Sequence, residues 1–287
     1  MNPAKNARPR LPIPSRCNPQ PLFLPILTMA SFAIMSQVRQ AIADDAAKQD
    51  FPFRSDALKP LTMPNPSALP VKICGLSTPA TLRAALDAGA DMIGLNFHPK
   101  SPRFVTLERA KELAEIARGK TEIVALIVDW DEKQAVELVE ALKPDWLQLH
   151  GRETPDYVAA LRRAVGLPVM KALGIAEAED LKAIAAYRDV ADRILLDAKP
   201  PKDAAFPGGH GRPFDWTLLA ELDPDFAFML SGGLDPANVA EAIRIARPAG
   251  VDVSSGVESA PGIKDPARIA EFIAAARKAA AMDHLTS

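Results

Sequence analysis

Cysteine is scarce in this chain of 287 residues, and its first 66 residues contain no glycine. Two cysteines, Cys17 and Cys74, cannot form a disulfide framework, and such low usage is typical of proteins from a reducing compartment. The four histidines include no pair four residues apart, so the ligand spacing of a zinc helix is missing as well. We therefore expect a cytoplasmic protein that holds no metal.

A strong charge of either sign is also missing. The formal net charge is −2, which gives no general attraction to nucleic acid or to an acidic membrane surface. Hydrophobic residues make up 48% of the chain and charged residues 24%, as in soluble globular proteins with a large core. We expect neither a nucleic acid nor a membrane as a partner.

Residues 1–66 differ in composition from the rest of the chain. They hold 11 of the 27 prolines, whereas all 15 glycines lie from Gly75 onward. Prolines at this density exclude a regular helix or a central strand over most of the segment. Basic residues ahead of an apolar stretch at 22–35 are the mark of a secretory signal, but a proline interrupts that stretch. We interpret 1–66 as a largely disordered extension, or as an over-called translation start whose working start is Met63, and expect a chain without residues 1–62 to stay active.

From residue 70 the chain alternates between short apolar runs and segments of helical periodicity. The eight predicted strands are residues 70–74, 91–96, 122–128, 145–149, 168–172, 192–197, 226–230 and 250–253. Eight strand–helix units about 25 residues apart predict a parallel sheet that closes into a single-domain TIM (β/α)8 barrel over residues 70–283. An open doubly wound sheet is the alternative, but no G-x-G-x-x-G follows the first strand.

Three helix starts carry capping signals. Thr78 precedes Pro79, Asp131 precedes Glu132, and Asp235 precedes Pro236, so helices are predicted over 78–88, 131–142 and 235–246. A final helix is expected from about Asp265.

Catalytic groups of a TIM barrel lie at the carboxyl ends of the strands and in the loops that follow them. In this sequence those positions hold Cys74, Asn96, Asp129, Gln148, His150, Lys171, Asp197, Ser231, Ser254 and Ser255. A cysteine on an apolar strand is more often a small core residue, and a carboxylate there can cap a helix or join a salt bridge. Position alone leaves these readings open.

The loops after the last two strands favour a phosphate site. They read Ser231-Gly232-Gly233-Leu234 and Ser254-Ser255-Gly256-Val257-Glu258. Glycines let backbone N–H groups approach an anion, and a short helix beginning near Gly256 would direct its positive end to the same point. Barrels that bind phosphate use this pair of loops, although Gly232-Gly233 on its own could simply make a tight turn.

Seven motifs together resemble phosphoribosylanthranilate isomerase. They are K-I-C-G at 72–75, S-P-R at 101–103, Q-L-H-G at 148–151, L-D at 196–197, G-G-x-G-x-x-F-D-W at 208–216, S-G-G-L at 231–234 and D-V-S-S-G-V-E at 252–258. Each is weak alone, but they occur in order, at predicted strand ends, over residues 70–280. Residues 1–66 match nothing in that family.

The resemblance implies a cofactor-free Amadori rearrangement of a phosphosugar in tryptophan biosynthesis, carried out by a monomer or a homodimer. Asp197 matches the family's general acid and Cys74 its general base. To act as the base, Cys74 should be a thiolate, favoured by the positive charge of Lys72 or of the substrate iminium. Asp197 should keep its proton near neutral pH through partial desolvation and the nearby phosphate. Arg103 matches the residue that binds the anthranilate carboxylate, a role suited to a guanidinium fork.

The remaining site residues follow from the same resemblance. Gly232, Gly233, Ser255 and Gly256 are expected at the phosphate, and Gly209 in a loop that closes over the substrate. His210 in that loop stands where the family usually has a small polar residue. His150 is a possible base but is interpreted as a structural group or as one that supports the catalytic residues from behind, whereas Asn96 and Gln148 are polar lining at most and Asp129 is given no role.

Two classes of protein are alternatives. The first is another phosphosugar barrel: the related isomerase of histidine biosynthesis would need an aspartate in place of Cys74, and indole-glycerol-phosphate synthase would need lysines at the ends of early strands. A non-catalytic phosphosugar-binding barrel would lack Cys74 or Asp197, and both are present.

Overall fold

A computed structural model describes residues 69–199 and 213–283. They form a closed barrel of eight parallel strands in chain order, in which the last strand pairs with the first. The strands are β1 (Val71–Cys74), β2 (Met92–Asn96), β3 (Glu122–Ile127), β4 (Trp146–Leu149), β5 (Val169–Ile175), β6 (Arg193–Ala198), β7 (Phe228–Leu230) and β8 (Gly250–Val253). The predicted TIM (β/α)8 fold is confirmed, whereas the predicted extension over 1–66 lies outside the described residues.

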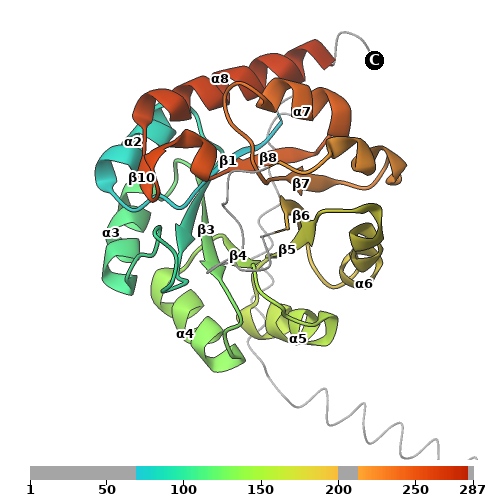
Figure 1. The fold of residues 1–287 in the computed structure, drawn as a ribbon. Coiled ribbons are helices and arrows are strands. Elements are labelled where there is room, and N and C mark those ends of the chain that lie inside the picture. The colour runs from blue at the N-terminus through green and yellow to red at the C-terminus, as the bar shows by residue number, and fades with distance from the viewer. Residues whose placement is uncertain (1–68, 200–212, 284–287) are drawn as a thin grey trace, which may run out of the picture. The chain divides into compact units, whose positions relative to one another are not determined.

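Helices surround the barrel (Figure 1). They are α2 (Pro79–Asp87), α3 (Leu107–Ala117), α4 (Glu132–Leu142), α5 (Pro155–Val165), α6 (Ile184–Tyr187), α7 (Val239–Ala246) and α8 (Pro266–Asp283). Short 3-10 helices η1 (Ala178–Ala183), η2 (Trp216–Glu221) and η3 (Ser255–Val257), and a hairpin of β9 (Glu258–Ala260) and β10 (Ile263–Lys264), complete the described elements.

Two of the three predicted helix starts are confirmed. The Thr78 side chain caps α2, and Asp131 forms a capping box with Gln134 at the start of α4. The predicted start at Asp235 is wrong, because α7 begins only at Val239. The Asp235 carboxylate instead accepts hydrogen bonds from the N–H groups two and three residues on and so closes a turn ahead of the helix.

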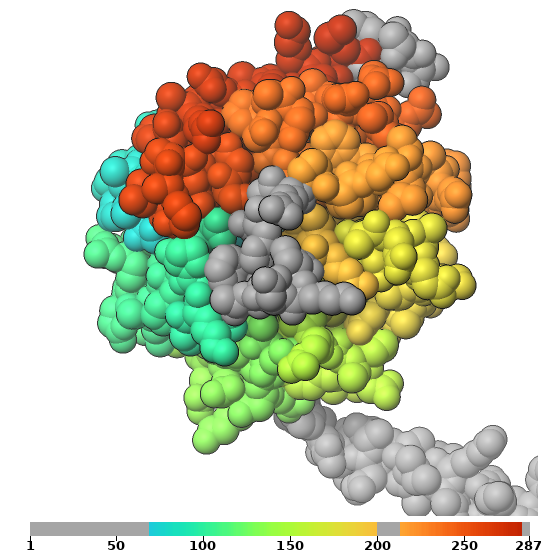
Figure 2. All heavy atoms as spheres, in the orientation of Figure 1, coloured from blue at the N-terminus to red at the C-terminus, as the bar shows by residue number. Residues whose placement is uncertain are grey.

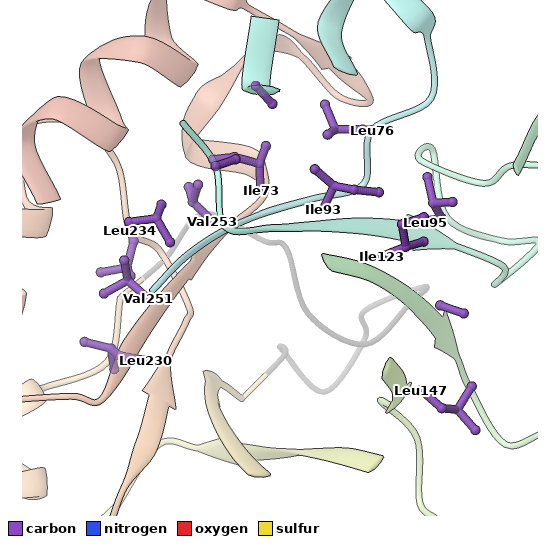
Figure 3. Close-up of a cluster of buried hydrophobic side chains, with 14 of the residues drawn as sticks. Ile73, Leu76, Ile93, Leu95, Ile123, Leu147, Leu230, Leu234, Val251 and Val253 are labelled. Atoms are coloured by element: carbon purple, nitrogen blue, oxygen red, sulfur yellow. The ribbon is translucent and has the colours of Figure 1, made fainter. Parts of the chain in front are cut away.

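Side chains of alternate strand residues divide the apolar interior into two cores. One set, including Ile73, Ile93 and Val251, is buried between the strands and the helices, and part of it appears in Figure 3. The other set fills the barrel itself near the amino ends of its strands. This inner core consists of Met92, Val124, Trp146, Met170, Ala172, Leu195 and Met229.

The last helix joins the two ends of the barrel domain. Helix α8 packs against both α7 and α2, and Figure 2 shows it along the rim. Arg277 of α8 donates to the Asp91 carboxylate at 2.5 Å and to the backbone oxygen of Leu69, so the final unit is fastened to the first. None of the described helices is both long enough and apolar enough to cross a membrane.

Candidate active site

A pocket of about 590 Å³, open to solvent at its mouth, lies at the carboxyl ends of the strands. Among the residues singled out from the sequence as site residues, six line it: Cys74, Arg103, Asp197, Gly232, Gly233 and Ser255. Leu126 and Val128 give it an apolar wall beside His98 and Ser101. Gly256 is not part of the lining, and Gly209 and His210 lie outside the described residues.

Cys74 ends β1 with its side chain directed into the barrel, two residues after Lys72 on the same face. Its strand partner is Gly94 of β2, and a Cβ atom at that position would lie 2.8 Å from the Cys74 sulfur. Only glycine therefore leaves room for the thiol at this height in the barrel. The Cys74 residue is buried, with 5% of its surface exposed.

Burial raises the pKa of the Cys74 thiol above its ordinary value. The positive charges of Lys72 and Lys264 act in the opposite direction, and the negative charge of Asp252 adds to the rise. The thiolate expected from the sequence is therefore not the favoured state of the resting site. Lys72 does oppose the rise as expected, without outweighing it.

Lys72 and Asp252 form a fully buried ion pair beneath the thiol. The Lys72 ammonium lies 2.8 Å from the Asp252 carboxylate, which also accepts a hydrogen bond from Ser231 at 3.1 Å. Burial alone would lower the pKa of Lys72, but Asp252 and Cys74 raise it overall. A lysine charge is thus held directly below the pocket.

Asp197 projects from β6 into the same pocket and is 4% exposed. One carboxylate oxygen accepts from the N–H of Ala198 at 2.9 Å, and the other lies 3.1 Å from Nε2 of His150. Nδ1 of His150 lies 3.1 Å from the side-chain nitrogen of Gln148. His150 therefore contacts the predicted acid directly, as a residue that supports the catalytic groups would.

Arg103 is buried in the pocket wall by a bidentate ion pair with Glu258. Its Nε donates at 2.7 Å and one Nη at 2.8 Å to the two carboxylate oxygens. Glu258 also binds Lys264 at 2.7 Å, and Lys264 donates to the backbone oxygen of Ser254 at 2.8 Å. The arginine is thereby linked to the loop after β8.

Glu258 and Lys264 were not among the residues singled out from the sequence. Glu258 closes the D-V-S-S-G-V-E motif, so a search for a buried partner of Arg103 could have found it there. Lys264 carries no such signal, because it lies in a two-residue strand of a hairpin that the sequence pattern does not predict.

The loops after β7 and β8 meet as predicted. Gly232 and Gly233 have φ values of 88° and 68°, in the left-handed region that favours glycine. Within the described part of the chain, neither of their N–H groups donates to another protein group. Gly256 also lets the two loops touch, since a Cβ there would lie 1.9 Å from the Leu234 oxygen, and its predicted phosphate contact stays a prediction.

Other residues that the sequence places at strand ends make their contacts outside the pocket. Lys171 turns to the outer face of the barrel and pairs with buried Glu153 at 2.9 Å. Asp129 has a φ of 52° and accepts from the N–H of Arg152. Gln148 is fully buried below His150 and does not line the pocket. Among the residues the structure describes, no group of three or more histidine, cysteine or acidic side chains could hold a metal ion.

The sequence of the barrel, compared with known families, matches one of them over nearly its whole length. A profile of the N-(5'phosphoribosyl)anthranilate isomerase family matches residues 71–275. The chain belongs to the phosphoribosylanthranilate isomerase family. The predicted family and enzyme class, an isomerase of tryptophan biosynthesis, are thereby confirmed.

Relatives and solved structures agree with this membership. The chain is 59% identical over 209 residues to N-(5'-phosphoribosyl)anthranilate isomerase from Rhodopseudomonas palustris strain BisA53, covering 73% of this chain and 96% of the relative. It is 57% identical over 212 residues to the enzyme of that name from Nitrobacter hamburgensis, covering 74% and 94%. The crystal structure of phosphoribosyl anthranilate isomerase from Thermotoga maritima superposes with a TM-score of 0.66 at 35% identity, over 73% of this chain and 99% of that one.

Two further structures of phosphoribosylanthranilate isomerase bear on the site and the assembly. One, at 32% identity and a TM-score of 0.63, is a complex with reduced 1-(o-carboxyphenylamino)-1-deoxyribulose 5-phosphate, and covers 73% of this chain and 99% of that one. Another, at 33% identity and a TM-score of 0.63 with the same coverage, is a monomeric variant of the dimeric Thermotoga maritima enzyme.

Proposed function

We propose that this protein converts N-(5′-phosphoribosyl)anthranilate to 1-(2-carboxyphenylamino)-1-deoxyribulose 5-phosphate, with Asp197 as general acid and Cys74 as general base. The observation that carries the proposal is that an acid and a thiol face one pocket from strands lying nearly opposite each other, above two loops suited to phosphate. Family membership supports the reaction, and the geometry supports these two residues in the two roles.

The first step opens the ribose ring. Asp197 gives its proton to the ring oxygen while the anthranilate nitrogen donates its electron pair to C1′, so the C1′–O bond breaks and an iminium forms. The Asp197 carboxylate that results accepts N–H bonds from Ala198 and His150. Those two donors stabilise the charge that develops on the acid.

The second step removes the C2′ proton. The iminium makes that proton acidic, and Cys74 takes it as a thiolate to give an enolamine, which then tautomerises to the ketone. Because burial raises the pKa of the resting thiol, Cys74 releases its own proton to solvent once the iminium has formed, when the positive charges of the iminium, Lys72 and Lys264 together stabilise the thiolate. The Cys74 thiolate is thus formed next to the positively charged iminium whose C2′ proton it removes.

The two ends of the substrate have matching sites. Gly232, Gly233 and Ser255 offer backbone N–H groups and a hydroxyl to the phosphate. Arg103 lies in the pocket wall, fixed by Glu258, where its planar guanidinium suits the anthranilate carboxylate. Gly209 belongs to the loop assigned to closure over the substrate, and Gly256 supports the phosphate loop by letting it approach Leu234.

The proposed reaction needs no cofactor, because Asp197 supplies the proton for ring opening and Cys74 removes the proton from C2′. We assign the protein to the cytoplasm on its low cysteine content. A monomer or a homodimer is the assembly consistent with a dimeric relative from Thermotoga maritima.

The test follows the fluorescence of phosphoribosylanthranilate as it is consumed. Wild type should be active, and Cys74→Ser and Asp197→Asn should each lose on the order of 10²- to 10⁴-fold in kcat. Cys17→Ser is the matched control, because it removes the other cysteine of the chain, and it should keep full activity. An inactive wild type, or full activity in either site variant, would contradict the proposal.

A further inference from the structure

We propose that His150 is a positioning residue for Asp197, and that buried Gln148 sets its tautomer so that Nε2 carries the hydrogen. This inference rests on the proposed function, because it gives His150 a task in the ring-opening step. The sequence left open whether His150 is structural or supports the catalytic residues, and the proposal commits to the second role and says how it is performed. It also gives Gln148, which is absent from the pocket lining, a part in the same step.

The geometry fixes the direction of the hydrogen bonds. The side-chain nitrogen of Gln148 faces Nδ1 of His150 at 3.1 Å, and an amide nitrogen can only donate. Nδ1 therefore accepts, and the hydrogen of a neutral ring lies on Nε2. Nε2 faces Asp197 at 3.1 Å, so His150 donates to the carboxylate.

The buried position of Gln148 is explained by its hydrogen bond to His150. It is fully buried, and its side-chain oxygen has no partner in the part of the chain that the structure describes. Burying an amide is unfavourable unless it is hydrogen-bonded, and the one side-chain bond that Gln148 makes goes to His150. A residue with a purely packing role would be apolar at this position.

The backbone around His150 is held as firmly as its ring. The N–H of His150 donates to the Ile127 oxygen at 3.0 Å, within the strand region. The next residue, Gly151, donates to the Glu153 carboxylate and accepts from Lys171 at 2.9 Å. The buried Lys171–Glu153 pair, which lies outside the pocket, thus fixes the loop that presents the imidazole.

The hydrogen bond from His150 stabilises the Asp197 carboxylate that remains after the proton has been transferred. A neutral Asp197 gains little from a donor, whereas the carboxylate left after protonation of the ring oxygen gains a charge-assisted bond from Nε2. Among the described residues, the other ionisable side chains that line the pocket are Cys74 of β1, His98 and Arg103 after β2, and Asp252 of β8. In this part of the chain the Asp197 carboxylate contacts the N–H of Ala198 and Nε2 of His150. His150 is the ionisable side chain that reaches it.

The kinetic test compares two replacements of His150 in the full chain. His150→Gln keeps an N–H donor near the place of Nε2 and should retain kcat within about threefold, whereas His150→Leu should lose about 10- to 100-fold, the usual effect of a hydrogen bond to a charged group. KM should stay within about twofold in both, because His150 is in neither the proposed phosphate site nor the proposed carboxylate site. Arg152→Gln, an exposed neighbour in the same loop, should match wild type. Equal losses in the two His150 variants, or no loss in His150→Leu, would overturn the proposal.

Nitrogen NMR of the imidazole decides the tautomer without reference to activity. In ¹⁵N-histidine-labelled protein, the signals lost in His150→Gln identify this ring, which should show a protonated Nε2 and a bare Nδ1. In Gln148→Met, which keeps the volume and removes the donor, the preference should weaken and the two tautomers should mix. A hydrogen on Nδ1 in wild type, or an unchanged spectrum in Gln148→Met, would overturn the inference. If wild type proves inactive on the substrate, only the proposed function fails, because this readout still reports the hydrogen bonds.

Discussion

The two ends of the barrel interior differ in the side chains that fill them, which are mainly apolar at the amino ends of the strands and ionisable at the carboxyl ends. At the amino ends the space is filled by apolar side chains such as Met92, Met170 and Met229, with the Arg193 guanidinium 4.5 Å from the Trp146 ring centre. At the carboxyl ends ionisable side chains replace them, and Lys72, Arg103, Lys264, Asp197 and Glu258 are each paired or hydrogen-bonded. One end depends on shape and the other on charge.

This difference shows where the fold can tolerate polar groups. The carboxyl end buries Lys72, Arg103 and Lys264, and each has a carboxylate within 2.8 Å. A buried charge is strongly unfavourable without such a partner. Substitutions at the two ends should therefore destabilise the protein in different ways. At the carboxyl end they leave a buried charge unpaired, and at the amino end they leave a cavity.

The largest effect is expected from Lys72→Met. It leaves the Asp252 carboxylate buried without its cation, so the free energy of unfolding should fall by about 3–5 kcal/mol. The double variant Lys72→Met with Asp252→Asn should recover most of that loss, since the charge is gone and the Ser231 hydrogen bond can remain. Urea titration measures both, and a single variant as stable as wild type would show that charge pairing does not govern this end.

Met170→Ala tests the opposite end. Met170 is completely buried in the inner core, so the cavity should reduce the free energy of unfolding by about 2–4 kcal/mol while kcat changes by less than about twofold. Ile263→Ala, at a residue 61% exposed, is the control and should stay within about 0.5 kcal/mol of wild type. A large loss of activity in Met170→Ala at temperatures where it remains folded would contradict the claim that the apolar core at the amino end affects stability and not activity.

Gly94→Ala should sharpen the comparison, because it disturbs the carboxyl end without removing a charge. The new Cβ would lie 2.8 Å from the Cys74 sulfur and 3.0 Å from its Cα, so the thiol must move. Misplacing a reacting group by about 1 Å can reduce kcat by roughly 100-fold, while the strain costs about 1–3 kcal/mol of stability. Gly89→Ala, where a Cβ meets nothing within 4 Å but φ is 85°, controls for substitution of a glycine. Unchanged kcat in Gly94→Ala would show that the thiol position is not critical.

The smallest effect concerns acid. Burial alone would raise the pKa of Glu258, but Arg103 and Lys264 lower it overall below its ordinary value of 4.5. Its contribution to stability is therefore fully present above pH 4.5 and is lost as the pH falls through the lowered value. Denaturant titrations between pH 6 and 3 should show this loss in wild type and a shallower slope in Glu258→Gln. Equal slopes would contradict the ion-pair account of this cluster.

The sequence predicted the fold well because strands and helices alternate with clear periods. All eight strands appear within three residues of their predicted ends, since each run of apolar residues is bounded by polar or turn-forming ones. The start of α7 was misplaced because Asp235-Pro236 is equally suited to a turn and to a helix start. Capping signals show that the chain can begin a helix, without showing that it does.

Site residues could be predicted where position on a strand determines direction. Cys74 and Asp197 point inward because alternation in β1 and β6 leaves no other choice. Lys171 follows the same rule and points outward, which the list of strand ends overlooked. The bond between His150 and Asp197 and the Glu258 pairing join residues 47 and 155 positions apart, and no local pattern encodes such partners.

The burial of Cys74 also protects the protein chemically. Oxidants attack a thiolate far faster than a thiol, and here burial keeps the resting sulfur protonated and enclosed, with the Lys72–Asp252 pair closing the space beneath it. Among the described residues, Cys74 lines the pocket and is 5% exposed. In the resting protein the proposed base should therefore react slowly with peroxide and with disulfides.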